Sequence, residues 1–378
     1  MTLEEIRGLY PHIKTGRTYF NHAAIGPVST FVKDKLDKYL YARSVDPIEN
    51  YQAFIEVASS AKRRLAGLLN AKKNRIAWTE NVSSGINILA QGLKWNKGDR
   101  IILNDLEFPS NVYPFMNLKK EGVEIDFVKS HEGRADAEDY EKLINPKTKL
   151  ISISLVQFLS GYRADIKSLG ELCKKHDIIF CVDVIQAAGV IQIDVEDSNI
   201  DFLAGGSHKW LMSLQGLGYI YITPGLMDKM EQKYAGWLSV DDDWNLLNYD
   251  LKYKPAASRY QVGTNSAIGI TALESSLELF ESFGMAEIEK LNLSNTYYFI
   301  EKLNENGYKP LLADAGKNNI AGITSVKFEN AEKIFKELAE KKINAALRQG
   351  VIRFSPHYYN SAEEIDMVIE NLNLITKK

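Results

Sequence analysis

Short apolar runs alternate with longer amphipathic stretches between about residues 50 and 225. Seven of these runs are rich in Ile, Val, Phe and Tyr and have the length of strands. They occupy residues 75–80, 99–105, 124–130, 149–157, 177–183, 201–206 and 217–223. Helical patterns lie between several of them, as at residues 164–176, where Ile166, Leu169, Leu172 and Cys173 follow a 3.6-residue period. Strands that alternate with crossover helices predict an α/β fold with a mostly parallel seven-stranded sheet.

The pattern changes after residue 266. A helical stretch at 267–283 is followed by helical patterns at 285–307, 330–342 and 360–375, with strand patterns at 322–328 and 350–355. Ser361 and Glu364 have the spacing of a capping box at the start of the last helix. We therefore expect a large α/β domain over residues 15–265 and a smaller α+β domain over 266–378. Residues 1–14, which include a predicted helix, could pack on either domain.

The amino-acid composition limits the class of protein and the partners that it can bind. The 378 residues include 45% hydrophobic and 25% charged residues, as in ordinary globular proteins. Lys and Arg together number 46 against 49 for Asp and Glu, so no basic field favours nucleic acid or an anionic membrane. The two cysteines argue against a disulfide framework. With no secretory leader and no apolar stretch of about 18 residues, the sequence predicts a cytoplasmic protein.

Polar residues follow the predicted strands where a parallel sheet binds its ligands, beyond the carboxyl ends. "IIFCVDVIQAAG" places Asp183 at the end of an apolar strand, and "DFLAGGSHKWL" places Lys209 beyond the next one. "NVSSG" opens a helix whose free N–H groups, with the Ser83 and Ser84 hydroxyls, form a generic anion site. Taken singly, each has a structural alternative: a helix cap for Asp183, a snorkelling Lys209, and simple capping by the serines.

Together these groups meet the needs of pyridoxal phosphate: an amine for a Schiff base, an acid for the pyridine nitrogen, and a helix end for the phosphate. The sequence resembles fold-type I pyridoxal-phosphate enzymes of the class V aminotransferase group, which includes cysteine desulfurases, kynureninases and isopenicillin N epimerases. The resemblance runs from "YFNHAAIGP" to "IRFSPHYYNSAEEID". It implies the PLP-dependent transferase fold type I and pyridoxal 5'-phosphate as the cofactor.

The resemblance implies a role for each matching residue around the cofactor. Lys209 would bind the cofactor covalently, Asp183 would pair with its ring nitrogen, and Gln186 would bond its phenolic oxygen. The residues implied at the phosphate and the ring face are Val82, Ser83, Ser207, His208 and Phe108. Thr264 in "YQVGTNS" would reach the phosphate of a neighbouring subunit, which implies a homodimer with shared active sites.

The resemblance also implies the substrate contacts. Arg353 matches the arginine that clamps an α-carboxylate, although alone it could be a surface arginine on a strand. His22, Gln157 and Trp237 are the other candidates, and Trp237 could equally belong to the core. No metal ligands are expected.

Some positions depart from the desulfurases. Phe108 stands where many class V enzymes stack a histidine, and it cannot move protons. "FPSN" and "VQFLSG" are closer to kynureninases, while "DVIQAAG" and "SHKW" keep the pattern of desulfurases and epimerases. Desulfurases also need a nucleophilic cysteine ahead of the arginine, and "INAALRQGVIRFS" has none, which argues against a persulfide on the protein.

These observations predict a pyridoxal-phosphate enzyme that acts on a small amino acid or amine, with class V aminotransfer as the first choice. The alternative is a lyase or epimerase, resembling cysteine or selenocysteine lyases, kynureninases or isopenicillin N epimerases. A dehydrogenase would need G-x-G-x-x-G between a strand and a helix, and "GLGYIYI" leads into a strand. A non-enzymatic regulator that binds the cofactor would carry a basic DNA-binding module, for which the chain has no room.

Overall fold

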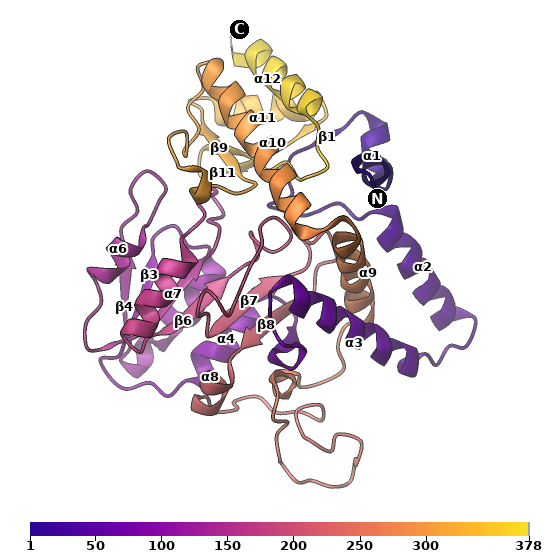
Figure 1. Ribbon diagram of the computed structural model, residues 1–378, viewed down its shortest axis with the longest axis vertical. Coiled ribbons are helices and arrows are strands. Elements are labelled where there is room, and N and C mark those ends of the chain that lie inside the picture. The colour runs from indigo at the N-terminus through magenta and orange to yellow at the C-terminus, as the bar shows by residue number, and fades with distance from the viewer. Residues whose placement is uncertain (377–378) are drawn as a thin grey trace.

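The computed structural model describes residues 1–376, and its largest element is a seven-stranded sheet (Figure 1). The strand order is β2-β8-β7-β6-β5-β3-β4. The strands are β2 (Ile76–Thr79), β3 (Arg100–Asn104), β4 (Glu124–Val128), β5 (Thr148–Ser154), β6 (Ile179–Asp183), β7 (Phe202–Gly206) and β8 (Gly218–Ile222). Six lie inside the predicted runs, and β5 begins one residue before its run of 149–157. The sheet is mostly parallel, as predicted, because only β8 runs against its neighbours.

Because most strands run in one direction, the loops that follow them lie at the same edge of the sheet. β2, β3, β5, β6 and β7 all run the same way. The loops that follow Thr79, Asn104, Ser154, Asp183 and Gly206 therefore start side by side. We call this side of the sheet the carboxyl edge, and ligands of such sheets bind there.

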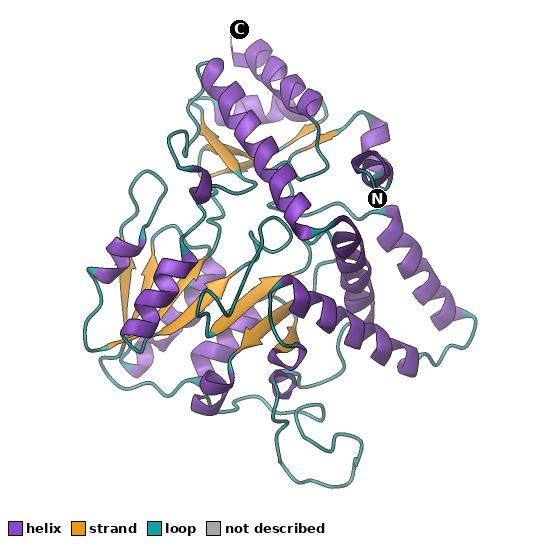
Figure 2. Cartoon of the chain, viewed as in Figure 1, coloured by secondary structure: helices purple, strands orange, loops and turns teal. Residues whose placement is uncertain are grey.

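Helices cover both faces of the sheet, as Figure 2 shows. One apolar cluster joins the sheet to α3 (Tyr51–Leu68), α7 (Ile166–Lys175) and α9 (Ala267–Phe283). A second cluster joins the opposite face to α4 (Val82–Gly92), α5 (Tyr113–Met116) and α8 (Pro224–Lys229). Because both faces are buried, the central strands β6, β7 and β8 are buried at every residue and lack an alternating polar pattern, whereas the edge strand β4 is only partly buried.

A second, smaller sheet has the order β11-β12-β9 and is antiparallel. Its strands are β9 (Thr324–Lys327), β11 (Ala346–Arg348) and β12 (Val351–Phe354), and it packs with α10 (Met285–Glu305), α11 (Ala331–Glu340) and α12 (Ala362–Thr376). The predicted capping box is present, since Ser361 N donates to Glu364 Oε2 at 2.8 Å and Glu364 N donates to Ser361 Oγ at 3.4 Å. This is the small α+β unit that the sequence predicts after residue 266.

The first 70 residues contact both units. β1 (Thr18–Tyr19) pairs with β10 (Ile343–Asn344), next to the small sheet. Side chains at the end of α1 (Leu3–Gly8) pack between α9 and the segment before α12. The helix α2 (Thr30–Ser44), which packs on α9, was not predicted from the sequence. The helix α6 (Ala137–Glu141) is a single turn. The boundary at residue 266 stays a prediction.

Among residues 1–376, no helix has both the length and the apolar character that crossing a bilayer requires. The cytoplasmic location expected from the sequence stays a prediction.

Close packing at Gly170 gives a test of the fold. A Cβ at this position of α7 would lie 1.9 Å from the backbone oxygen of Ser198. We expect Gly170→Ala to lower the free energy of unfolding by about 1–3 kcal/mol through overpacking, measured by urea denaturation. Gly225→Ala in α8 is the control, because nothing lies within 4 Å of the new atom. Equal stability of the two variants would contradict this packing.

Candidate active site

An acid and an amine meet at the carboxyl edge. Asp183 is the last residue of β6 and is 2% exposed, and its Oδ1 accepts a hydrogen bond from Ile185 N at 2.9 Å. Lys209 follows β7, the parallel neighbour of β6. The Lys209 Nζ lies 5.7 Å from the ring centroid of Phe108, which belongs to the loop after β3. Three strand ends thus contribute to one site.

Burial and charge shift the pKa values of both groups. Burial raises the pKa of Asp183, and the negative charge of Glu107 adds to this while the positive charge of Lys209 opposes it. Burial lowers the pKa of Lys209; the charge of Asp183 opposes that shift, whereas Arg353 and Arg348 lower the pKa further. A larger fraction of this amine is therefore neutral near pH 7 than of an exposed lysine. A neutral amine is the nucleophilic form.

The amino end of α4 lies at the same edge. Asn81 caps the helix: its Oδ1 accepts from Ser84 N at 2.9 Å, and its backbone oxygen accepts from Gly85 N at 3.2 Å. The N–H groups of Val82 and Ser83 lie ahead of these and have no intrahelical acceptor. Ser83 Oγ is 3.0 Å from Ser110 Oγ in the loop after β3. This helix end can receive an anion.

Gln186 is held in one orientation beside the lysine. Trp210 Nε1, which can only donate, bonds Gln186 Oε1 at 2.8 Å, and Gln186 Nε2 donates to Ala23 O at 3.0 Å. The second N–H of the amide remains available to a ligand. The backbone oxygen of Trp210 lies 3.0 Å from His357 Nε2. The indole N–H and the backbone oxygen of Trp210, the residue after Lys209, are therefore both fixed by residues far away in the sequence.

Ser207 and His208 stand just ahead of Lys209. Ser207 Oγ lies 2.6 Å from Leu214 O and 2.9 Å from Leu217 O, so it closes the loop after β7. Burial lowers the pKa of His208, and the charge of Lys209 lowers it further. This ring is therefore neutral at physiological pH.

Glu107 is a site residue that the sequence analysis missed. It is 8% exposed, and its Oε1 accepts from Asn104 Nδ2 at 2.7 Å, Ser154 N at 2.8 Å and Gln157 Nε2 at 2.9 Å. Its Oε2 accepts from Asn111 Nδ2 at 2.9 Å and from Ser154 Oγ at 2.5 Å. Glu107 lies just beyond an apolar strand, so the strand-end argument used for Asp183 could also have found it.

Arg353 enters the site from β12 of the small sheet. It is 2% exposed, and its Nη1 donates to Phe158 O at 2.6 Å. Within residues 1–376 its buried Nε has no partner and no carboxylate forms an ion pair with it. Burial lowers its pKa to about 10, with a contribution from Arg348. A buried guanidinium without an anion is costly, so this position suits an incoming carboxylate.

Phe158 connects this arginine to the lysine. Its ring meets that of Phe108 edge-on, with 5.2 Å between the centroids. The Phe108 ring is the one that lies near Lys209, so Arg353, Phe158, Phe108 and Lys209 are linked by direct contacts. Gln157, the residue before Phe158, belongs to the same group.

Within residues 1–376, three residues predicted at the site make no direct bond to Lys209 or Asp183, although the His22 ring stacks on Trp210 with 5.9 Å between the centroids. His22 is fully buried, with Nδ1 2.8 Å from Ser355 O and Nε2 2.7 Å from the Tyr359 hydroxyl. Trp237 is 37% exposed, on the long loop that projects from the molecule after α8 (Figure 1). Thr264 is exposed ahead of α9. In the described chain, none of the three bonds Lys209 or Asp183, and their roles stay predictions.

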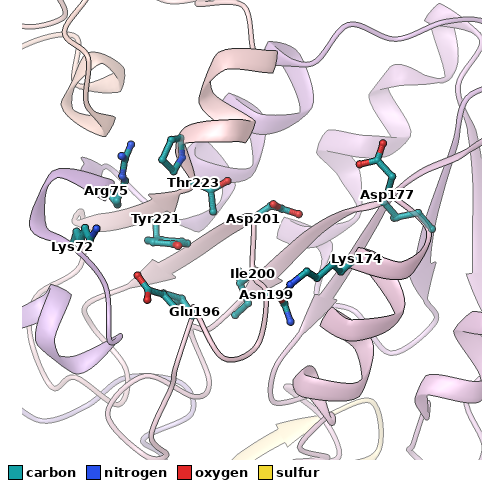
Figure 3. A pocket seen from close by; sticks show the side chains of 13 residues that line it. Lys72, Arg75, Lys174, Asp177, Glu196, Asn199, Ile200, Asp201, Tyr221 and Thr223 are labelled. Carbon is teal, nitrogen blue, oxygen red and sulfur yellow. Dashed lines mark hydrogen bonds between the residues drawn. The ribbon is translucent and has the colours of Figure 1, made fainter.

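A surface hollow of about 530 Å³ lies elsewhere, at the opposite edge of the sheet (Figure 3). It opens at the amino ends of β6 and β7. Basic and acidic side chains both line it: Lys72, Arg75, Lys174, Asp177, Glu196 and Asp201. None of the predicted site residues faces it, and its mixed charges do not converge on one point. The candidate active site is therefore the carboxyl edge.

Neither cysteine exposes its thiol at the carboxyl edge, because both are buried. Burial raises the pKa of Cys173 in α7 and of Cys181 in β6, so both thiols stay protonated. Such thiols are inert packing groups. Among residues 1–376, no cluster of three His, Cys, Asp or Glu side chains could hold a metal ion.

The chain is similar to known proteins over nearly its whole length. The family model "Aminotransferase class-V" matches residues 18–368. The uncharacterized aminotransferase YcbU of Bacillus subtilis is 27% identical, over 98% of this chain and 97% of that protein. The apo cysteine desulfurase of Thermococcus onnurineus NA1 has the same fold, with a TM-score of 0.89 and 24% identity, over 99% of this chain and 98% of that one. The cystine C–S lyase C-DES, in complex with its reaction product cysteine persulfide, gives a TM-score of 0.87 and 24% identity, over 96% of this chain and 98% of that one.

The charges around Lys209 predict how its pKa responds to substitution. Asp183→Asn removes the charge that raises the pKa of Lys209, so this pKa falls, whereas Arg353→Gln removes a charge that lowers it, so the pKa rises. Competitive acylation across a pH series, followed by mass spectrometry of Lys209, measures both changes. The protein is first dialysed against hydroxylamine to free the amine from any carbonyl compound. Asp201→Asn, at the opposite edge, is the control and should change nothing; the reverse order of pKa values would contradict the site.

Proposed function

Since the chain belongs to the aminotransferase class-V family, we propose that it is a pyridoxal-phosphate-dependent carbon–sulfur lyase of a small sulfur-containing amino acid. The observation that carries this proposal is the convergence of Lys209, Asp183 and the unpaired, buried Arg353 at the carboxyl edge. Together they offer a nucleophilic amine, an acid and a carboxylate receptor within one site.

The side chains at the edge fit the cofactor. Lys209 has a lowered pKa, and its Nζ makes no hydrogen bond or ion pair within the described chain. The free N–H groups of Val82 and Ser83 would hold the phosphate at the amino end of α4, with His208 beside it. Ser207 would support them by closing the loop that carries the lysine. Pyridoxal phosphate, when bound, supplies a ring that accepts electrons from the bond broken at the substrate α-carbon.

Other residues would orient that ring. The Asp183 carboxylate would hold a proton at the ring nitrogen, and its buried position strengthens this interaction. Gln186 would donate its free N–H to the phenolic oxygen, since its amide oxygen is taken by Trp210. Phe108 would pack on the ring face, where it supplies contact area and no proton.

Arg353 and Lys209 would act on the substrate. Arg353 would bind the α-carboxylate, which gives its buried guanidinium an anion. Lys209 would take the proton from the α-carbon as a general base. The bond between the β-carbon and sulfur would then break, and the sulfur would leave as a thiol or persulfide with a proton from solvent or Lys209. Gln157 would contact the same ligand from the loop after β5.

The state of the thiols favours release of the sulfur with the product. Cys173 and Cys181 are buried with raised pKa values, so neither can accept sulfur at this edge. A lyase needs no protein thiol, and a C–S lyase is among the proteins with the same fold. Aminotransfer is the second candidate, because the relative YcbU is described as an aminotransferase. Kynureninase-like and epimerase-like reactions stay predictions without further support.

The lyase reaction can be tested with L-cystine. The protein loaded with pyridoxal phosphate should release pyruvate and ammonia, and Lys209→Ala should lower kcat by about 10²–10⁴ through loss of the general base. Cys173→Ser and Cys181→Ser should keep the activity, because both thiols are buried packing groups. Pyruvate and ammonia are followed by coupled assays.

Three outcomes would contradict this prediction in different ways. Amino transfer to a keto acid without release of pyruvate would favour the second candidate. Loss of sulfur release in either cysteine variant would mean that the protein carries a persulfide. Borohydride reduction followed by peptide mass spectrometry should put the pyridoxyl adduct on Lys209, and an adduct on another lysine would overturn the cofactor site.

We also propose a homodimer in which Thr264 completes the partner's phosphate site. Thr264 is exposed and makes no side-chain hydrogen bond within the described chain, although it lies in a polar turn. The segment between α8 and Thr264 also exposes large apolar side chains, as interaction surfaces do. They are Tyr234, Trp237, Trp244, Leu246, Leu247, Tyr249, Leu251 and Val262.

Subunit exchange tests the shared site. Thr264→Ala should weaken cofactor retention by about 1.5–3 kcal/mol, the worth of a hydrogen bond to a charged group. Mixing Lys209→Ala with Thr264→Ala protein should restore activity, because one site of the heterodimer carries both changes and the other carries neither. No recovery despite verified exchange, or a fully active monomer in sedimentation, would end the proposal.

A further inference from the structure

Gln157 is a buried amide with only one end satisfied. Its Nε2 lies 2.9 Å from Glu107 Oε1, and its Oε1 is buried without a partner among residues 1–376. An unpartnered buried acceptor is costly, so such atoms ask for an explanation.

Glu107 fixes the orientation. Ser154 N, a backbone group that can only donate, bonds Glu107 Oε1 at 2.8 Å. Asn104 presents Nδ2 to the same oxygen at 2.7 Å, because its Oδ1 accepts from Leu106 N at 2.9 Å. Glu107 Oε1 is thus an acceptor. If Gln157 were turned around, its amide oxygen would face this carboxylate oxygen, so only the amide nitrogen fits.

Gln157 lies beside the candidate active site, since its partner Glu107 is close enough to Asp183 to raise the pKa of that acid. Gln157 follows β5 at the carboxyl edge, and the next residue, Phe158, contacts both sides of the site. Its backbone oxygen accepts from Arg353 Nη1 at 2.6 Å, and its ring meets Phe108, which lies against Lys209. The amide of Gln157 therefore lies among the groups that would surround a bound amino acid.

We propose that Glu107 is a positioning residue that turns the amide oxygen of Gln157 toward the ligand, so that the site selects an amino acid whose side chain donates a hydrogen bond. This selection rests on the proposed function for its ligand. A hydroxyl or thiol on the β-carbon satisfies the acceptor, whereas a methyl group leaves it unsatisfied. Leaving a buried acceptor unpaired costs roughly tenfold or more in affinity.

A pair of ligands isolates this contact. L-Serine and L-2-aminobutyrate share the amine and carboxylate and differ by a hydroxyl in place of a methyl group. We expect the holoenzyme to bind L-serine about tenfold more tightly, from initial absorbance changes of the bound cofactor in rapid-mixing titrations. Glu107→Met, which removes the acceptor that holds the amide of Gln157, and Gln157→Leu should both bring this ratio close to one.

A control variant separates positioning from damage to the fold. Ser154→Ala removes one donor from the same carboxylate but keeps the contact of Glu107 with Gln157, so it should keep the ratio. Adding Glu107→Met to Gln157→Leu should change the ratio no further, since both act through one amide. If Glu107→Met does not fold, Glu107→Asp serves, because it keeps the charge but shortens the reach. An unchanged ratio in the Glu107 variant would overturn the proposal.

A measurement without cofactor distinguishes this proposal from the proposed function. In protein labelled with ¹⁵N-glutamine, the Nε2 signal of Gln157 is identified by its loss in Gln157→Leu. One of its protons should be protected from exchange by the carboxylate, and this protection should vanish in Glu107→Met and persist in Ser154→Ala. An unprotected proton in the wild type would overturn the positioning role. The absence of a pyridoxyl adduct on Lys209 would instead count against the proposed function.

Discussion

Buried charge at the carboxyl edge is the constraint on which the rest of the site depends. Asp183, Glu107 and Arg353 are each almost fully buried, and Lys209 is half-buried beside them. Ionised groups in such a place must be satisfied by partners, or their pKa values shift. The acids and the cations do not form ion pairs with one another in the described chain. Neutral donors surround Glu107 and a carbonyl receives Arg353, so the two cations keep their capacity for a ligand.

Two glutamines then give the site opposite polarities. Trp210 can only donate, so Gln186 offers its remaining N–H. Glu107 accepts, so Gln157 offers its oxygen. Free amides could turn to suit any ligand, but these two are held by partners that allow one orientation each. The buried partners Trp210 and Glu107 therefore decide whether each amide presents a donor or an acceptor to a ligand.

The sequence revealed the parts whose signal is local. Most strands of the large sheet were recognisable because helices bury both faces. Asp183 was recognisable because it ends such a strand, and Lys209 because it follows one. α2 escaped because it buries only Val32, so its apolar period is weak. The partners of Glu107 and Trp210 could not be read from the sequence, since Glu107 bonds Ser154 47 positions away and Trp210 bonds His357 147 positions away. Side-chain partners at such separations depend on the packed fold, which is also why a matching motif did not reveal that both nitrogens of His22 are already bonded.

Phe108, which lies near Lys209, also limits how protons can move. Phe108 carries no proton, the two thiols are buried, and lowered pKa values keep His208 neutral. Burial moves the pKa values of both Asp183 and Lys209 toward neutrality, and Lys209 is the group that the proposed function places against the substrate α-carbon. A reaction that inverts the α-carbon needs proton carriers on two opposite faces, whereas elimination can use one base and a leaving group that takes its own proton. With Lys209 as the base beside Arg353, the arrangement suits breaking a bond at the β-carbon, which needs no second proton carrier on the opposite face.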